Sequence, residues 1–255
     1  KNIEIYDNIS TPFLNGGGNG AGGGIFINGQ LNLEMEDFYL ANNTANWIGA
    51  GISINSNSAP ITMKRGIFEQ NGSLENVSGG AIFASAFPAT TITMESVVFE
   101  GNRSEDGAIF AASAHYNFTN CTFTGNESQE GANLFSISDN SYISIRNSII
   151  DSAANGINTI FMSTGSVTAQ NCLFTNSLPA EITNLGNVLA NTDPLFADPD
   201  NSDYQLMQDS PAVDSGVNSF LLLSPGLDAA GNIRISNNTV DMGAYEYQHS
   251  LSITE

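Results

Sequence analysis

Basic residues are scarce in this sequence: 6 lysines and arginines stand against 26 aspartates and glutamates, and the formal net charge is −20. This charge repels nucleic acid and anionic membrane surfaces, so neither is expected as a partner. An anionic polysaccharide is repelled too unless a cation bridges the contact, whereas Ca²⁺ or a neutral glycan is compatible. The acidity alone selects no ligand, because it is also typical of a soluble secreted surface.

Long apolar segments are absent as well. No run of 18 apolar residues exists and no signal peptide is visible, so we expect no direct membrane insertion. The chain opens on Ile3–Asn8, which already has the form of the second half of the coil described below. We therefore expect a truncated N-terminus, with residue 1 not the native start.

A pattern of apolar strands and corner residues occurs twice between Gly80 and Asn126. The first copy consists of Gly80–Phe83, Ile92–Met94 and Phe99–Asn102, and the second of Gly107–Phe110, Tyr116–Phe118 and Phe123–Asn126. A repeat of this length indicates a solenoid. The 25 glycines and 15 phenylalanines favour β-coils with small corner residues and aromatic core stacks, whereas helical repeats need alanine, leucine, glutamate and lysine.

Two recurring positions extend the repeat over most of the chain. From Tyr39 on, the corner motif recurs every 24 to 31 residues, and the other strand recurs every 25 to 30. The corner motif aligns as Ile5–Asn8, Tyr39–Asn42 (or with Phe38 at the corner), Phe68–Asn71, Phe99–Asn102, Phe123–Asn126, Ile150–Ala153 and Phe174–Ser177. The other strand aligns on Ile25, Ile52, Ile82, Ile109, Leu134 and Ile160. In Ile61–Met63 and Ile92–Met94 the apolar residues share one face and threonine points the other way. We predict that Phe68, Phe99 and Phe123 form one column inside the coils.

Small residues at the corners support stacking. Glycine before the isoleucine strand (Gly24, Gly51) or before Ala-Ile (Gly80, Gly107), and Gly131, suits a positive φ or a close approach of adjacent coils. The corner asparagines are predicted to form a stacked amide ladder. A buried ladder leaves no room for a glycan, although many asparagines stand in Asn-x-Ser/Thr sequons: Asn8, Asn42, Asn71, Asn76, Asn102, Asn117, Asn120, Asn126 and Asn237.

The two cysteines, Cys121 and Cys172, each stand two residues before a corner phenylalanine, with one whole coil between them. Strands in adjacent coils lie about 4.8 Å apart, so these residues are separated by roughly 9 to 10 Å, too far for a disulfide. We expect buried free thiols that pack as small hydrophobic groups.

From Asn191 the period stops and turn-forming residues dominate. This predicts two parts: coils over 1–190 and a C-terminal capping segment over 191–255 that closes the open C-terminal edge. The segment contains Asp193–Phe196 (DPLF), Asp203–Leu206 (DYQL), Ser210–Gly216 (SPAVDSG), Asp228–Arg234 (DAAGNIR) and Val240–Glu246 (VDMGAYE).

The order of these motifs resembles the C-terminal signature of bacterial secreted right-handed parallel β-helix proteins of the choice-of-anchor type, found in Bacteroidota. The coils, with Gly79–Ile82 and Phe-x-x-Asn, are also similar to the repeats of chlamydial polymorphic outer-membrane proteins, which are adhesins. Together these resemblances imply an acidic, pectin-lyase-like repeat protein at the extracellular or outer-membrane surface, with a sorting or anchor region beyond Glu255.

The coils contain few charged residues that could carry out catalysis. A polysaccharide lyase needs a Ca²⁺-binding carboxylate cluster and an arginine or lysine base, and a glycoside hydrolase needs two carboxyl groups across one bond. No spacing in the sequence selects such a set. Asp151 and Glu100 could form a carboxyl pair, but only because both are present. The full list of candidates is Lys64, Arg65, Arg103, Arg146, Asp106, Asp139, Asp151 and Glu100. His115 and His249 have no triad partners and are taken as surface histidines.

Other candidate sites have structural explanations. Asp198, Asp200 and Asp203 are spaced as in a Ca²⁺ loop but lack its glycine and bidentate glutamate, so a turn is favoured. Arg234 is predicted to form a structural ion pair with Asp241 and Glu246. Trp47 fits either a sugar-stacking platform or a cover over the coil edge.

The sequence thus predicts an all-β protein: a right-handed parallel β-helix of about six to seven coils with a C-terminal cap. No catalytic, cofactor-binding or metal-binding residue is assigned, and Ca²⁺ is the one ion left open. The predicted function is a non-catalytic binding or adhesion module for a glycan or a surface protein. The alternatives are a carbohydrate-active enzyme, either lyase or glycoside hydrolase, and a structural subunit of a larger surface complex.

Overall fold

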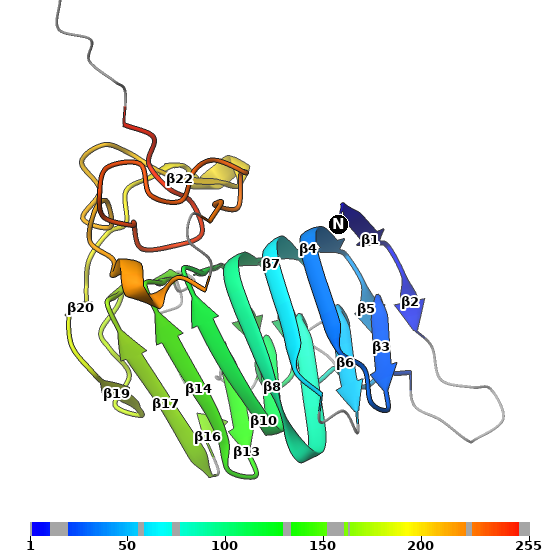
Figure 1. Ribbon diagram of the computed structural model, residues 1–255. Helices are drawn as coiled ribbons and strands as arrows, with labels where there is room; N and C mark the ends of the chain where they lie inside the picture. The colour runs from blue at the N-terminus through cyan, green and yellow to red at the C-terminus, as the bar shows by residue number, and fades with distance from the viewer. Residues whose placement is uncertain are drawn as a thin grey trace, which may run out of the picture.

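The coils form a parallel β-solenoid of about five turns with almost no helix (Figure 1). This computed structural model describes residues 2–10, 20–55, 59–72, 77–129, 134–151, 161–162, 164–222 and 226–249. The predicted all-β class and the parallel solenoid are confirmed. Right-handedness, the number of six to seven coils and the boundary at residue 190 stay predictions.

The strands of one large sheet follow the coils in order, and every pairing within it is parallel. One end of each coil is formed by β3 (Ile25–Asn28), β6 (Ile52–Asn55), β13 (Phe135–Ser138) and β16 (Phe161–Met162). The long strands are β4 (Leu33–Ala41), β7 (Ile61–Glu69), β8 (Ile82–Glu100), β10 (Ile109–Thr119), β14 (Ser141–Arg146), β17 (Gly165–Gln170) and β19 (Ile182–Asn184).

A third side of the coils carries short strands: β1 (Ile3–Tyr6), β11 (Thr122–Thr124), β15 (Ile149–Asp151), β18 (Cys172–Phe174) and β20 (Val188–Leu189). β1 pairs with the end of β4, β11 pairs with the end of β8, and β15, β18 and β20 each pair with the strand before them in this list. Two further parallel pairs join β2 (Ile9–Ser10) to β5 (Thr44–Ala45) and β9 (Arg103–Ser104) to β12 (Glu127–Ser128). An antiparallel pair, β21 (Phe196–Asp198) and β22 (Asp203–Leu206), and the 3₁₀ turns Pro199–Asn201 and Asn218–Phe220 follow the coils.

An aromatic column fills the interior, as the sequence predicts. The rings of Phe68 and Phe99 stack with centroids 5.0 Å apart, and those of Phe99 and Phe123 with centroids 4.9 Å apart. In the preceding coil the column continues with Leu40, not with Tyr39 or Phe38. Tyr39 turns outward, because its hydroxyl donates a hydrogen bond of 2.8 Å to Glu69. The predicted corner in this coil was therefore wrong by one residue.

The second recurring position also needs one correction. Ile25, Ile52, Ile82 and Ile109 lie side by side in adjacent strands, as predicted, but the next position is Phe135 rather than Leu134. Phe135 is buried and packs against Phe118 and Phe123, and the larger ring thus takes the interior position. Ile160, Ala153, Gly131 and Asn76, named in the sequence alignment, lie outside the described residues, as does most of the long loop after Ser10.

The predicted amide ladder runs along one corner of the coils, through Asn8, Asn43, Asn71, Asn102 and Asn126. In the first four of these residues, the Nδ2 group donates to the Oδ1 atom of the next asparagine at 2.9–3.0 Å. The backbone N–H group of each of these four donates to the same Oδ1 atom at 3.1–3.2 Å. Asn43 takes the place predicted for Asn42, which is exposed, because the whole corner is shifted with Leu40.

A second corner is built from residues with left-handed backbone that recur along the coils. They are Asn2, Asp37, Arg65, Ser96, Asn120, Asn147 and Asn171, all with φ between 45° and 57°. Asparagine and aspartate accept this conformation more readily than most residues. This corner separates the side formed by the long strands from the third side of the coils.

Glycine and cysteine behave as the coil packing requires. A Cβ atom on Gly51 would lie 2.5 Å from the carbonyl oxygen of Ala81, and one on Gly80 would lie 2.2 Å from that of Arg103. Close approach of adjacent coils therefore explains both glycines. Cys121 and Cys172 are buried and free, as predicted, and burial raises the pKa of both thiols to about 12.

The segment after the coils packs along their third side, and closure of the C-terminal edge by this segment stays a prediction. Phe196, Tyr204 and Met242 form a buried cluster with Val98, Ile149 and Leu173 of the coils. Hydrogen bonds join Asn120 to Asp241, Asn147 to Val217, and Thr122 to Ala244. We call residues 193–249 the flank cover, and Figure 1 shows it in yellow to red above the long strands.

Arg234 holds the flank cover together from inside. It is fully buried and donates hydrogen bonds to the carbonyl oxygens of Ala244, Gly243 and Asp241. Its Nε atom lies 3.8 Å from Glu246 Oε2, so the predicted ion pair is present with Glu246. Asp241 contributes its carbonyl group to Arg234, while its carboxylate accepts the N–H groups of Asp214 and Tyr247.

Folding is expected to be more stable in mild acid than at neutral pH. Burial raises the pKa of Glu246 to about 7 from 4.5, and Arg234 opposes this only in part. The folded protein then holds a proton that the unfolded chain releases, so the free energy of unfolding falls as pH rises from about 4.5 to about 7. Burial also raises the pKa of Glu95, Asp151 and Asp241, which act in the same direction.

Urea unfolding between pH 5 and pH 8 measures this dependence, with Glu246→Gln as the comparison. The glutamine does not titrate, so the variant should lose less stability than the natural protein over the same range. Equal stability of the natural protein at pH 5 and pH 8 would contradict the expectation.

Candidate functional site

A row of polar side chains crosses the outer face of the long strands, one from each coil. The register places Glu34, Thr62, Thr93, Asn117, Ser144, Thr168 and Thr183 side by side. All of them are partly or fully exposed, because their apolar neighbours in each strand point into the core. We call these seven residues the polar row; six of them are uncharged.

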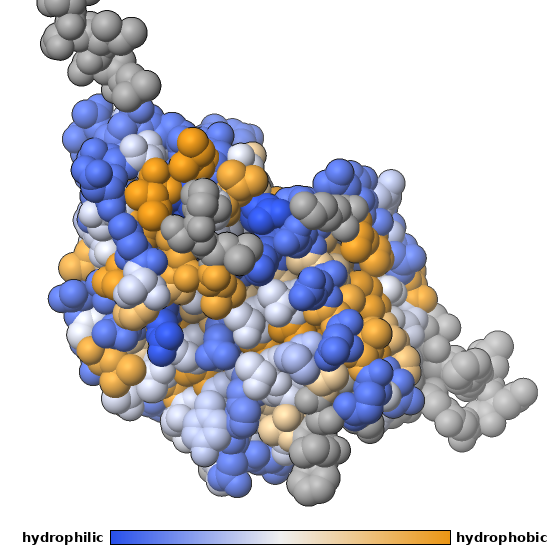
Figure 2. All heavy atoms as spheres, viewed as in Figure 1, coloured by the Kyte–Doolittle hydropathy of each residue, from blue (hydrophilic) through white to orange (hydrophobic). Residues whose placement is uncertain are grey.

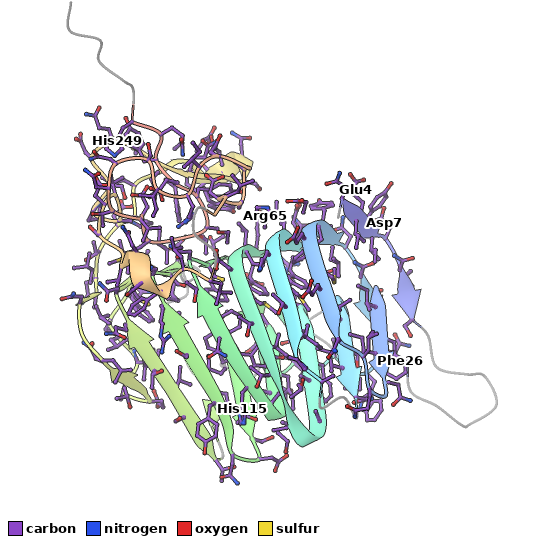
Figure 3. All side chains as sticks on the ribbon, in the orientation of Figure 1. Glu4, Asp7, Phe26, Arg65, His115 and His249 are labelled. Carbon is purple, nitrogen blue, oxygen red and sulfur yellow. The ribbon has the colours of Figure 1, made fainter. Side chains whose placement is uncertain are left out.

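Two adjacent rings, tilted against each other, lie next to the polar row. His115 pairs with Tyr142 in the adjacent strand, and their ring centroids are 4.8 Å apart with a tilt of 47°. Tyr142 is 53% exposed. Figure 3 labels His115 at the lower end of this face, and Figure 2 shows pale and blue residues interspersed with orange ones on the same side of the molecule. The rings give the face an apolar platform beside a line of hydroxyl and amide groups.

The flank cover borders the face on its other side. The N–H group of Leu222 donates a hydrogen bond of 2.7 Å to Glu95 Oε2, and the Arg146 guanidinium lies 5.1 Å from the centre of the Phe220 ring. Burial raises the pKa of Glu95. These contacts involve Glu95 and Arg146, which lie two residues after polar-row residues in their strands. The polar row itself stays accessible.

The predicted basic candidates are held in ion pairs or on separate sites. Arg65 lies 2.7 Å from Asp37 and 3.3 Å from Glu36, and a cavity of about 450 Å³ is lined by Glu4, Asp37 and Arg65 with residues 229–231 of the flank cover. The hydrogen bond that Arg65 donates to Asp37 is the main cause that raises the pKa of Arg65. Arg65 is therefore a poor base, although it lies near two carboxylates in one cleft.

Arg103 and Arg146 do not meet. Arg103 is exposed on β9 and lies 3.4 Å from Glu127, whereas Arg146 ends β14 beside Phe220. Asp106 accepts a hydrogen bond from Ser78, and Asp139 lies in the turn between β13 and β14. The structure thus separates these charged candidates among different loops and strands.

Glu100 and Asp151 lie in one outer row on the third side, with Thr124 between them. Glu100 accepts hydrogen bonds from the hydroxyl groups of Ser202 and Tyr204 of the flank cover. Asp151 accepts one of 3.0 Å from Thr124. Because the flank cover engages Glu100 and leaves Asp151 at an opening, the two carboxyl groups do not form a site together.

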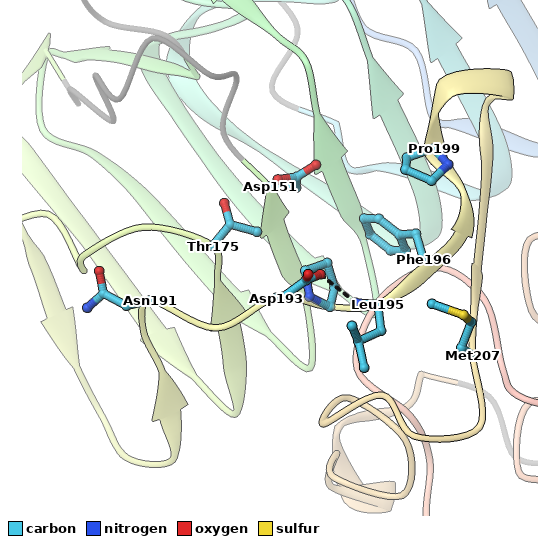
Figure 4. A pocket seen from close by; sticks show the side chains of 9 residues that line it. Asp151, Thr175, Asn191, Asp193, Leu195, Phe196, Pro199 and Met207 are labelled. Atoms are coloured by element: carbon cyan, nitrogen blue, oxygen red, sulfur yellow. Dashed lines mark hydrogen bonds between the residues drawn. The ribbon is translucent and has the colours of Figure 1, made fainter.

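Asp151 instead shares an opening with Asp193, a residue that the sequence did not mark as a candidate. Both line a cavity of about 550 Å³ between the coils and the start of the flank cover (Figure 4). Burial raises the pKa of Asp151; hydrogen bonds from Thr124 and Thr175 oppose this, and Asp193 adds to it. The sequence held one signal, the aspartate of the DPLF motif directly after the coils, but no spacing linked it to Asp151.

The remaining candidates have separate environments. The acidic stretch forms the predicted turn: Asp198 pairs with Asp203 across the antiparallel strands, and Asn201 donates to Asp198. In the described part of the chain, no group of three or more His, Cys, Asp or Glu side chains could hold a metal ion. His249 lies 3.4 Å from Asp214, and Trp47 is 49% exposed.

The sequence matches no family model and no curated protein. Among the described residues, no helix has the length and apolar character needed to cross a membrane. The long-strand face with the polar row and the cavity beside Asp151 are therefore the features that indicate a function.

Proposed function

We propose that this chain is a non-catalytic binding module at the extracellular or outer-membrane surface, and that it holds an extended, uncharged polysaccharide on the polar row. The observation that carries the proposal is the row itself: seven accessible side chains in register across adjacent strands. Adjacent strands lie about 4.8 Å apart, so the row offers a regular line of hydrogen-bonding groups on a rigid support.

The chemistry of the face favours a neutral sugar chain. Hydroxyl and amide groups donate to and accept from sugar hydroxyls, and the apolar face of a sugar ring can pack on Tyr142 and His115. The net charge of −20 disfavours uronates, sulfates and nucleic acid. Secretion in the manner of Bacteroidota β-helix proteins is consistent with this proposal and rests on the sequence resemblance.

The lyase alternative receives less support, because Arg65 is engaged by Asp37 and Glu36 and is a poor base. Assembly into a larger surface complex needs an extended apolar strip, whereas the long-strand face presents hydroxyl and amide groups along its middle. Binding of a neutral glycan is therefore the function that the face supports best.

The test is affinity electrophoresis of the protein through gels that contain xylan, mannan, galactan or a mixed-linkage β-glucan. Tyr142→Ala should weaken binding about tenfold, since it removes the exposed ring beside the row. Tyr6→Ala is the matched control, because Tyr6 is 54% exposed and lies away from the face. Thr93→Arg should block the row, whereas Gln205→Arg adds the same group to the exposed strand β22.

Retardation by none of the four neutral polysaccharides would contradict the proposal. Equal retardation of the Tyr142→Ala and Tyr6→Ala variants would contradict the assignment of the face.

A further inference from the structure

The cavity beside Asp151 is a second concave surface, separate from the polar row. It lies where β15 and the residue after β18 meet the start of the flank cover. Its volume of about 550 Å³ falls within the range of about 300–1,000 Å³ that is typical of small-molecule sites. Its lining residues are Asp151, Thr175, Asn191, Asp193, Pro194, Leu195, Phe196, Pro199 and Met207.

The polar wall is held in place before any ligand arrives. Asp151 is fixed by the hydrogen bond from Thr124, and Asp193 Oδ1 accepts the N–H group of Leu195 at 2.8 Å. Leu195 has a φ of 52°, a left-handed conformation that a bulky residue adopts only when its surroundings impose it. The carbonyl group of Leu195 accepts a further hydrogen bond from Met207. Such prior ordering lowers the entropic cost of binding.

The opposite wall is apolar. Figure 4 shows Phe196, Pro199 and Met207 across the cavity from Asp151 and Thr175, and Met207 is 45% exposed. A carboxylate, a hydroxyl and an amide group on one side and apolar carbon on the other match the two faces of a sugar ring. The hydroxyl groups of such a ring can donate to carboxylates, and its C–H face can pack against an apolar wall.

Charge narrows the ligand class. In the part of the chain that the structure describes, the lining residues include two aspartates and no lysine or arginine. A sugar that carries a carboxylate, sulfate or phosphate would therefore meet two like charges without a counter-charge. An uncharged ring avoids this repulsion.

We propose that this cavity binds one uncharged pyranose residue, such as the end of a glycan chain, with Asp151 and Asp193 accepting hydrogen bonds from its hydroxyl groups. This site lies on the third side of the coils and does not depend on the long-strand face. The two proposals can therefore fail separately.

Saturation-transfer NMR and calorimetric titration with the methyl glycosides of glucose, galactose, mannose and xylose test the proposal, in buffer with EDTA. At least one glycoside should bind, and Asp193→Asn should weaken it by about tenfold or more. The asparagine keeps an Oδ1 acceptor for the Leu195 N–H group, so the turn is retained. Asp203→Asn is the matched control, because Asp203 accepts the N–H group of Gln205 in the same way but does not line the cavity.

A second variant, Met207→Ala, tests the apolar wall and is also expected to weaken binding, whereas Tyr142→Ala should leave it unchanged. The proposal is overturned if no neutral glycoside binds with a Kd below about 10 mM. It is equally overturned if the Asp193→Asn and Asp203→Asn variants bind the glycoside with the same affinity, or if glucuronate binds better than glucose. Binding of Ca²⁺ at the site in the absence of sugar would overturn it as well.

Discussion

Replacement of Asn102 by alanine is expected to lower the free energy of unfolding by about 4 kcal/mol. The Asn102 side chain is fully buried and makes four hydrogen bonds of 2.8–3.1 Å, to Phe68 and Asn126 as donor and to two N–H groups of Asn71 as acceptor. Alanine would leave those groups buried without partners, at about 1–3 kcal/mol each before relaxation. Urea unfolding followed by circular dichroism measures the loss.

Asn117→Ala provides the control for this substitution. Asn117 lies on the exposed face of β10, and its removal should change stability by no more than about 0.5 kcal/mol. Hydrogen exchange should also show that Asn102→Ala weakens protection in the neighbouring coils at Phe68 and Asn126. If the two variants were equally stable, the amide ladder would not be the element that stabilises the corner.

The interior of the coils was predictable because its residues repeat. Phe68, Phe99 and Phe123 each stand three residues before an asparagine, and parallel coils place equivalent positions directly above one another. The same argument predicts the ladder and the free cysteines. A position that recurs in sequence is thus also a position in space, provided that each coil has been aligned correctly.

Alignment failed where one coil offered two equivalent choices. Residues 38–43 contain three adjacent large side chains and two adjacent asparagines, so the pattern fits in more than one register. In the structure, Leu40 and Asn43 take these positions. The Tyr39 hydroxyl group donates a hydrogen bond to Glu69 outside the coil, whereas inside the aromatic column it would have no hydrogen-bond partner. Leu134 and Phe135 presented the same ambiguity.

The candidate sites depend on neighbours that no single coil reveals. Thr62 and Thr93 could be assigned to the outer face from alternation alone, but the polar row also needs Asn117 and Ser144, whose types differ. Asp151 and Asp193 meet only because the flank cover turns back along the third side of the coils. Nothing periodic in the sequence marks that path, so the sequence did not predict this contact.

Replacement of Arg234 by methionine is expected to destabilise the flank cover by about 3–5 kcal/mol. The substitution leaves Glu246 buried beside Asp241 without its cation, and it removes the donors that serve Ala244, Gly243 and the Asp241 carbonyl. Hydrogen exchange read by mass spectrometry should show faster exchange over residues 226–247. The interior strands at Phe99 and Phe123 should keep most of their protection, because their core is separate from the cluster under the flank cover.

Arg103→Met is the matched control, because it makes the same change at an exposed ion pair with Glu127, where the loss should stay below about 1 kcal/mol. Adding Glu246→Gln to Arg234→Met should recover part of the stability, since the double variant no longer buries an unpaired carboxylate. If Arg234→Met exchanged no faster than Arg103→Met over residues 226–247, the buried arginine would not be what holds the flank cover together. Its attachment would then depend on the apolar contacts of Phe196, Tyr204 and Met242 with the coils.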